Sequence, residues 1–337
     1  MATCIAVDAM GGDDAPNAIV EGAIRAARDA GGTVDIVLFG QEDPVRASLT
    51  AHPEAQDLPI HVQHAPDVIG MSDAPASAVK TKQGSSIHRG LAAHEQGDAD
   101  AFISAGNTGA VMAASMFILG RIPGIARPSI VGYFPTLKGA SIVLDIGSNV
   151  DCKPSHLVQF ARMGTVYLRH VHDNDAPSVG LLNIGEEPGK GNEQVKAAHD
   201  QLKDTDDIHF KGNVEGSDLL FYASDIIICD GFVGNIMLKF GETMTTVLSE
   251  MTRQEMERQG LSPEEKKLVS GVLSEVRKGF DPEGRGGAPL LGVNGTVMVG
   301  HGSSSPEAIA QLIHSAIDVA DKNVTRALTD AFAADSA

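Results

Sequence analysis

The sequence predicts an α/β fold with a mainly parallel sheet and helices on both faces. Short β-branched runs alternate with helical patterns along most of the chain, which indicates successive βαβ units. The chain holds 37 glycines, many of them in tight turns that follow the predicted strands. Tryptophan is absent and aromatic residues make up only 4%, so the core must rely on aliphatic side chains. That composition is typical of α/β packing.

The predicted strands are short runs rich in Val and Ile. In chain order they cover residues 4–8, 34–40, 60–64, 101–106, 129–134, 141–147, 179–185, 225–231 and 296–302. The predicted helices lie between them, at 16–30, 76–95, from 107, from 154, from 191 and from 306. Pro16, Pro154 and Pro306 each open a helix, since proline suits the first helical turn.

Residues 235–278 break this alternation, because their pattern is almost entirely helical. The interruption is the sequence GLSP, in which Ser262 could cap a second helix that begins at Pro263. We therefore expect a protruding helical hairpin, used for dimerisation or docking. The rest is expected to be one α/β domain over residues 1–330, followed by a tail at 331–337.

Charge and cysteine usage exclude some classes of protein. The formal net charge of -18 argues against nucleic-acid binding, which needs an excess of clustered Lys and Arg. Cys4, Cys152 and Cys229 lie far apart with no CxxC pair, which favours reduced thiols in the cytoplasm. The sequence also shows no secretory signal and no apolar stretch of membrane-spanning length.

Glycine-rich segments follow the predicted strands and open the next helix. They read DAMGGDDAP, SAGNTGA, LDIGSNVD, NIGEEPGKGN, CDGFVGN and GHGSSSPE. Ligands of open parallel sheets bind beyond the carboxyl ends of the strands, where helix N-termini offer free N–H groups to anions. A single such turn is more often only a turn, but six of them with polar neighbours predict a phosphate-binding protein.

Polar side chains beside these glycines add hydrogen-bond donors. SAGNTGA contributes Ser104, Asn107 and Thr108, and HGSSSPE contributes His301 and Ser303. The next serine in HGSSSPE, at position 304, has capping-box spacing with the glutamate at 307 and is expected to cap a helix.

No metal or cofactor is predicted. The sequence lacks the local motifs of dinucleotide, nucleoside triphosphate, serine-hydrolase and zincin chemistry. Acidic residues near the loops could bind Mg²⁺, but we expect them more often to cap or hydrogen-bond a loop backbone. They are Asp8, Asp13, Asp145, Asp151 and Asp230.

Longer motifs identify a family. They are IAVDAMGGDDAP, SAGNTGA, LDIGSNVDCKPSHLVQFARMG, LLNIGEE with GKGNE, NVEGSDL, CDGFVGNIMLK, GGAPLLGVNG and HGSS. Over residues 4–325 the chain resembles the phosphate:acyl-ACP acyltransferases of bacterial phospholipid synthesis. The resemblance implies a homodimeric α/β fold similar to isocitrate and isopropylmalate dehydrogenases and to phosphate acetyltransferases, without their metal or nicotinamide.

The resemblance also implies the reaction: a fatty acyl group passes from acyl carrier protein (ACP) to inorganic phosphate, giving acyl phosphate for phosphatidic acid synthesis. By motif, Lys190 and Asn235 correspond to the catalytic side chains. The implied substrate- and phosphate-binding residues are Gly11, Gly12, Asp13, Ser104, Gly106, Asn107, Thr108, His301, Gly302 and Ser303.

The family further implies a cytoplasmic protein with peripheral contact at the inner face of the membrane and a downstream glycerol-3-phosphate acyltransferase as partner. The hairpin tip, which is apolar in some relatives, here reads RQEMERQGLSPEEKK, and this charge disfavours strong membrane binding.

Three alternatives stay open. A phosphate acetyltransferase-like enzyme acting on acyl-CoA would use the same phosphate-binding loops. A dehydrogenase of the related fold would need a dinucleotide and a divalent metal. A non-enzymatic protein that tethers lipid-synthesis partners would not depend on its active-site residues.

Overall fold

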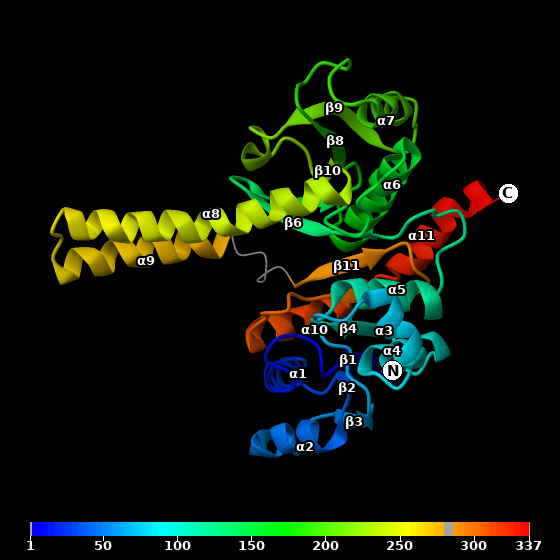
Figure 1. The fold of residues 1–337 in the computed structure, drawn as a ribbon, viewed down its shortest axis with the longest axis vertical. Coiled ribbons are helices and arrows are strands. Elements are labelled where there is room, and N and C mark those ends of the chain that lie inside the picture. Colours follow the sequence, from blue (N-terminus) through cyan, green and yellow to red (C-terminus); the bar gives the residue numbers. More distant parts are fainter. Residues whose placement is uncertain (1, 280–285, 337) are drawn as a thin grey trace. The chain divides into compact units, whose positions relative to one another are not determined.

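Two sheets organise the chain, and each lies in its own compact unit (Figure 1). The computed structural model describes residues 2–279 and 286–336. Unit 1 comprises Met1–Val131, Arg162–Ala176 and Arg285–Ala337, and unit 2 comprises Gly132–Ala161 and Pro177–Gly284. The expected single α/β domain over residues 1–330 therefore contains two compact units, each with its own sheet.

Unit 1 holds a seven-stranded sheet in the order β3-β2-β1-β4-β12-β11-β5. The strands are β1 Thr3–Asp8, β2 Val34–Gly40, β3 Ile60–His64, β4 Ala101–Ser104, β5 Ser129–Ile130, β11 Ala288–Leu291 and β12 Val297–Val299. The pairs from β3 to β12 are parallel, whereas β11 is antiparallel to both of its neighbours. The carboxyl ends of β1, β4 and β12 therefore lie next to one another at one edge of the sheet.

Helices cover this sheet in two groups. α1 packs against α10 and both contact strands, while α3 and α4 pack against α5 (Figure 1). The helices are α1 Asn17–Asp29, α2 Glu42–Thr50, α3 Pro75–Thr81, α4 Ser86–Gln96, α5 Thr108–Ile118, α10 Pro306–Asp321 and α11 Val324–Phe332, with 3₁₀ turns η1 Pro53–Ala55 and η4 Ala333–Ser336. α6, Pro154–Val171, contributes residues to both units.

Unit 2 holds a five-stranded sheet in the order β6-β7-β10-β8-β9, parallel except for β6. Its strands are β6 Gly132–Thr136, β7 Gly139–Leu144, β8 Ser178–Asn183, β9 His209–Glu215 and β10 Ile226–Ile228, and its helices are α7 Glu193–Lys203, α8 Gly231–Arg258 and α9 Pro263–Gly279, with the 3₁₀ turn η2 Leu219–Phe221. Phe134, Val143 and Ile227 belong to its buried aliphatic and aromatic core.

α8 and α9 form the predicted hairpin, extending beyond the sheet of unit 2 (Figure 1). The turn between them is built as predicted: the Ser262 hydroxyl accepts a hydrogen bond from the Glu265 N–H at 3.3 Å, and the Glu265 carboxylate accepts from the Ser262 N–H at 2.8 Å. The mixed α/β class and the hairpin are thus confirmed. Among the described residues, no helix combines the length and the apolar character that a membrane span requires.

Some predicted boundaries are wrong. The helix expected at 76–95 is two helices, because Ser85 caps α4 by accepting from the His88 N–H, and Gly84 donates its N–H to Asp67. The strand expected at 129–134 divides into β5 and β6, which belong to different sheets.

The C-terminal end also differs from its prediction. The tail expected at 331–337 begins inside α11, where the Phe332 ring is fully buried under the Arg162 guanidinium at 4.4 Å. Residue 337 lies outside the described residues. Burial of an aromatic ring explains why the chain remains helical to this point.

Candidate active site

Three predicted phosphate-binding loops meet in unit 1. They follow β1, β4 and β12, which are neighbours in the sheet. The Asp13 N–H donates to the Gly302 carbonyl at 2.7 Å, which joins the first loop to the third. A Cβ placed on Gly11 would lie 3.1 Å from the Ser104 Oγ, which brings the first loop against the second. We call these loops, residues 11–13, 104–108 and 301–303, the cradle.

Close backbone contact explains two of the cradle glycines. A Cβ on Gly106 would lie 2.4 Å from the Gly12 backbone nitrogen, a distance that no side chain tolerates. Gly12 itself has a φ of +93°, in the left-handed region, and a Cβ there would lie 3.0 Å from the Gly302 carbonyl oxygen. The two loops therefore approach as closely as they do because neither residue carries a side chain.

The buried carboxylate of Asp8, at the end of β1, accepts hydrogen bonds from groups in and beside the cradle loops. The Ser104 hydroxyl donates to the Asp8 Oδ2 at 2.7 Å, and the Met10 N–H donates to the Oδ1 at 3.0 Å. Burial raises the pKa of the Asp8 carboxyl, and hydrogen bonds from Ser86 and Ser104 oppose that rise. Asp8 thus holds loop backbone and hydroxyl groups, as expected for most acidic residues near the strand ends.

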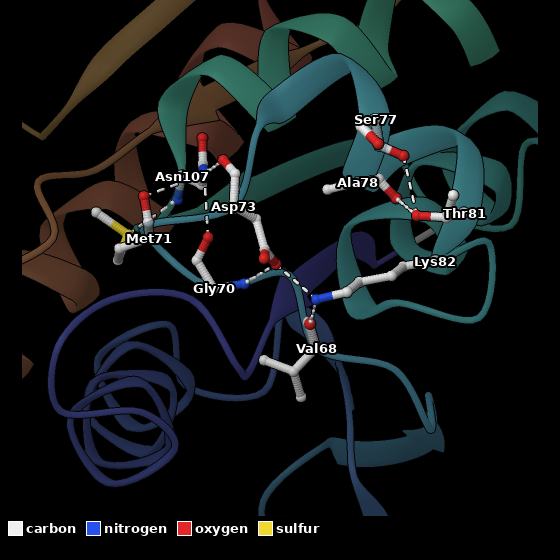
Figure 2. A network of polar contacts seen from close by, with 9 residues as sticks. All are labelled: Val68, Gly70, Met71, Asp73, Ser77, Ala78, Thr81, Lys82 and Asn107. Carbon is white, nitrogen blue, oxygen red and sulfur yellow. Dashed lines mark hydrogen bonds and ion pairs between the residues drawn. The ribbon is translucent and has the colours of Figure 1, made fainter.

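Asn107 is occupied by contacts within unit 1, as Figure 2 shows. Its Oδ1 accepts from the Ala110 N–H at 3.1 Å and caps α5. Its Nδ2 donates to the carbonyls of Gly70, Met71 and Asp73 at 3.0, 3.3 and 3.1 Å. The side chain therefore ties residues 70–73 to the cradle.

An ion pair holds the same segment, and it was missed in the sequence. The Lys82 Nζ donates to the Asp73 Oδ2 at 2.5 Å and to the Val68 carbonyl at 2.8 Å (Figure 2). The hydrogen bond from Lys82, together with one from the Gly70 N–H, holds the pKa of the Asp73 carboxyl below its usual value. No local motif marks this pair, because its partners belong to different turns of the chain.

Other cradle donors face outward. Thr108 is exposed at the first residue of α5, where the first helical N–H groups have no intrahelical acceptor. His301 and Ser303 are also exposed, and the His301 Nδ1 lies 2.7 Å from the Ser303 Oγ. The expected cap at Ser304 is wrong, since Ser305 accepts from the Ala308 N–H and caps α10. Ser304 instead accepts from the His301 N–H at 3.1 Å.

Lys190 lies in unit 2, in the loop after β8. Its ammonium is 4.0 Å from the Glu187 carboxylate, and its side chain remains half-exposed. The Lys190 carbonyl accepts from the Asn183 Nδ2 at 3.1 Å, and a Cβ on Gly185 would lie 2.9 Å from the Lys190 Cγ. The backbone of this loop is thus fixed while the charged end of the side chain stays accessible.

Asn235 also lies in unit 2, near the beginning of α8, after the neighbouring parallel strand β10. The helix cap is Asp230, which accepts from the Val233 N–H at 2.9 Å, so Asn235 is not a cap. The Asn235 side chain is exposed and lies next to Gly147, where a Cβ would be 3.6 Å from its Cγ. Lys190 and Asn235 therefore both follow carboxyl ends of adjacent strands in one sheet.

Two further acidic candidates, Asp145 and Asp230, accept hydrogen bonds from backbone N–H groups. Asp145 is fully buried and accepts from the Asn149 N–H at 2.6 Å, and Asp230 caps α8. Within residues 2–279 and 286–336, three or more His, Cys, Asp or Glu side chains nowhere gather as a metal site would require.

Comparisons with known proteins agree with the motifs. The family model described as "Fatty acid synthesis protein" matches residues 3–327. A protein of Salinibacter ruber named phosphate acyltransferase is 67% identical over 336 residues, which cover 100% of this chain and 99% of that protein.

Solved structures share the fold at low identity. A phosphotransacetylase from Streptococcus pyogenes has a TM-score of 0.60 at 19% identity, covering 95% of this chain and 94% of that chain. A 4-hydroxythreonine-4-phosphate dehydrogenase from Burkholderia phymatum has a TM-score of 0.50 at 12% identity, covering 96% of this chain and 98% of that chain. The predicted likeness to phosphate acetyltransferases and dehydrogenases is confirmed at the level of the fold. By its family model and its full-length relative, the chain belongs to the fatty acid synthesis protein family, the family of the phosphate acyltransferases.

Proposed function

We propose that this chain transfers a fatty acyl group from acyl-ACP to inorganic phosphate, giving acyl phosphate for phospholipid synthesis. The observation that carries the proposal is full-length membership of a phosphate acyltransferase family, combined with three glycine-rich loops that meet in unit 1. The names of the relatives support the reaction class, and the hydrogen-bond donors of the cradle support phosphate as the acceptor of the acyl group.

Phosphate binding is assigned to the cradle of unit 1. The proposed direct donors are the side chains of Thr108, His301 and Ser303, because these residues are exposed, and the backbone N–H groups of Thr108 and Gly109, which are the first two residues of α5 and are also exposed. Ser104 and Asn107 are proposed to act through the loops that they hold, since their side chains already bond within the unit. Asp13 contributes through its backbone bond to Gly302.

Lys190 and Asn235 are proposed to act on the thioester. A phosphate oxygen attacks the thioester carbonyl, the new C–O bond forms, and the C–S bond breaks to release the carrier thiolate. An ammonium and an amide donor can stabilise the oxyanion or the departing thiolate. The half-exposed Lys190 ammonium and the exposed Asn235 amide are both available for such contacts.

The proposed reaction needs neither a covalent acyl-enzyme nor a cofactor. A thiol of pKa about 8.5 is a good leaving group. Phosphate near neutral pH already carries a nucleophilic oxygen, so positioning and electrostatics can supply the catalysis.

The preferred acyl donor distinguishes the proposed enzyme from an acetyltransferase-like enzyme that uses acyl-CoA. We expect kcat/KM for long-chain acyl-ACP to exceed that for acetyl-CoA by at least about 10²-fold, because discrimination of this size is usual where a site binds the extra substrate parts. Steady-state rates with palmitoyl-ACP, palmitoyl-CoA and acetyl-CoA, each with phosphate, measure it. A preference for acetyl-CoA would replace the proposed donor.

We also propose a homodimer formed through the hairpin. Large apolar side chains are exposed along both helices. They are Phe232, Val233, Ile236, Phe240, Val247, Leu248 and Met251 in α8, and Leu268, Val272 and Val276 in α9. Those of α9 recur every four residues and therefore form one stripe. An exposed apolar surface of this kind is typical of an interaction site. In a two-fold symmetric dimer, the stripes of both copies would be buried against each other.

Charge placed on this stripe is expected to separate the two copies. Leu268→Glu combined with Val272→Glu should shift the mass in light scattering from that of a pair to that of one chain. Ser270→Glu is the matched control, because its position points away from the stripe. A wild-type chain that is monomeric at micromolar concentration would contradict the dimer.

A cytoplasmic location is part of the same proposal, with peripheral contact at the inner face of the membrane. There a glycerol-3-phosphate acyltransferase would consume the acyl phosphate. The hairpin tip carries exposed ion pairs between Arg253 and Glu250 and between Arg258 and Glu255, which supports weak rather than deep membrane contact. Sedimentation with lipid vesicles at low and high salt tests this part.

A further inference from the structure

One apolar side chain lies against the cradle. Met71 extends between two of its loops: a Cβ on Gly106 would lie 3.0 Å from the Met71 Sδ, and a Cβ on Gly302 would lie 3.0 Å from the Met71 Cε. The side chain remains 51% exposed, so it covers the glycines on one side and faces solvent on the other. By contrast, the cradle itself consists of glycines, one alanine and residues with polar side chains.

Several contacts fix the position of Met71. The Asn107 Nδ2 donates to its carbonyl at 3.3 Å, and the Asn107 backbone N–H donates to its sulfur at 3.1 Å. The ion pair between Asp73 and Lys82 anchors the same segment to the C-terminal end of α3 (Figure 2). An exposed methionine that is held in this way is a defined surface rather than a free side chain.

The chemistry of acyl transfer gives this surface a use. In the product, the carbonyl carbon is bonded to a phosphate oxygen, so the first methylene groups of the acyl chain lie within a few bonds of the bound phosphate. An apolar chain that leaves a polar cradle gains free energy by contact with an apolar side chain. Methionine suits such contact because its unbranched thioether adapts to the shape of its partner.

Building on the proposed function, we propose that Met71 contacts the acyl chain beside the phosphate and is a binding residue for the acyl donor. The contact is apolar, so its loss should affect the donor rather than phosphate. The alternative role is structural, with the sulfur serving as the acceptor that holds residues 70–73 against Asn107.

Two substitutions of similar size separate these roles. Leucine keeps the apolar surface and loses the acceptor, whereas glutamine keeps an acceptor and loses the apolar surface. Lys80→Gln, exposed on α3, is the matched control for the new side chain. Kinetics with palmitoyl-ACP and phosphate are measured for all three variants beside thermal unfolding.

We expect Met71→Gln to lower kcat/KM for palmitoyl-ACP about tenfold, with KM for phosphate unchanged, and Met71→Leu to retain most of the wild-type value. A loss in the leucine variant, or a glutamine variant equal to wild type, would overturn the acyl contact. If the wild-type chain itself forms no acyl phosphate, the proposed function fails and this inference fails with it. A wild-type chain that is active beside an unaffected glutamine variant overturns the role of Met71 alone.

Discussion

Replacing Lys190 or Asn235 by alanine is expected to lower kcat about 10² to 10³-fold, roughly 3 to 4 kcal/mol, with a much smaller change in KM. Both side chains are assigned to charge that develops as the thioester carbonyl is attacked. A contact made mainly in the transition state affects kcat, whereas one made equally to bound substrate affects KM. Initial rates of acyl phosphate formation over a range of acyl-ACP and phosphate concentrations measure both parameters.

The structure indicates that these variants remain folded. The Lys190 side chain is half-exposed and its ammonium lies 4.0 Å from the Glu187 carboxylate, and Asn235 is exposed and does not cap its helix. Lys196→Ala on α7 and Thr243→Ala on α8 are matched surface controls. Thermal unfolding should be unchanged in all four variants. Early unfolding in proportion to lost activity would make the two residues structural, and near-normal kcat in folded variants would remove them from the mechanism.

Gly106→Ala is expected to lower kcat/KM for phosphate about 10²-fold, because a small misplacement of binding groups costs that much in rate. The new Cβ would lie 2.4 Å from the Gly12 backbone nitrogen, so one loop of the cradle must move away from the other. The overpacking should also reduce the free energy of unfolding by about 1 to 3 kcal/mol.

Gly216→Ala is the control for this substitution. Apart from its two chain neighbours, no residue has an atom within 4 Å of a Cβ added at Gly216, and its φ lies outside the left-handed region, so alanine fits there without strain. The rates and thermal unfolding of both variants are compared with wild type. Normal phosphate kinetics in Gly106→Ala would show that the close approach of the two loops is not needed for binding.

Local sequence patterns predict much of the fold. Aliphatic runs identify β1 and β4 because both strands are buried in the sheet. The hairpin turn follows from Ser262 and Pro263, because the cap that Ser262 provides is a contact between residues close in sequence. By contrast, β11 falls in a segment rich in glycine and proline, and its pairing with β5 and β12 depends on distant residues. Local patterns contain no information about such pairing.

The candidate site likewise has features that the sequence predicts and features that depend on tertiary contacts. Glycine spacing predicts the three loops of the cradle, and the strand order explains why they meet. The same spacing does not reveal that the Asn107 side-chain amide donates hydrogen bonds to the carbonyls of residues 70, 71 and 73. Met71 was missed for a related reason, since its place beside Gly106 and Gly302 arises from tertiary contacts.

The most direct test of the central claim follows radioactively labelled inorganic phosphate into product. Wild-type protein is incubated with palmitoyl-ACP and the labelled phosphate, and the lipid fraction and the free carrier thiol are both quantified. We predict labelled palmitoyl phosphate in a one-to-one ratio with released carrier thiol, and no thiol release when phosphate is omitted. Thiol release that leaves the label in inorganic phosphate, or that proceeds at the same rate without phosphate, would contradict the proposed acyl transfer.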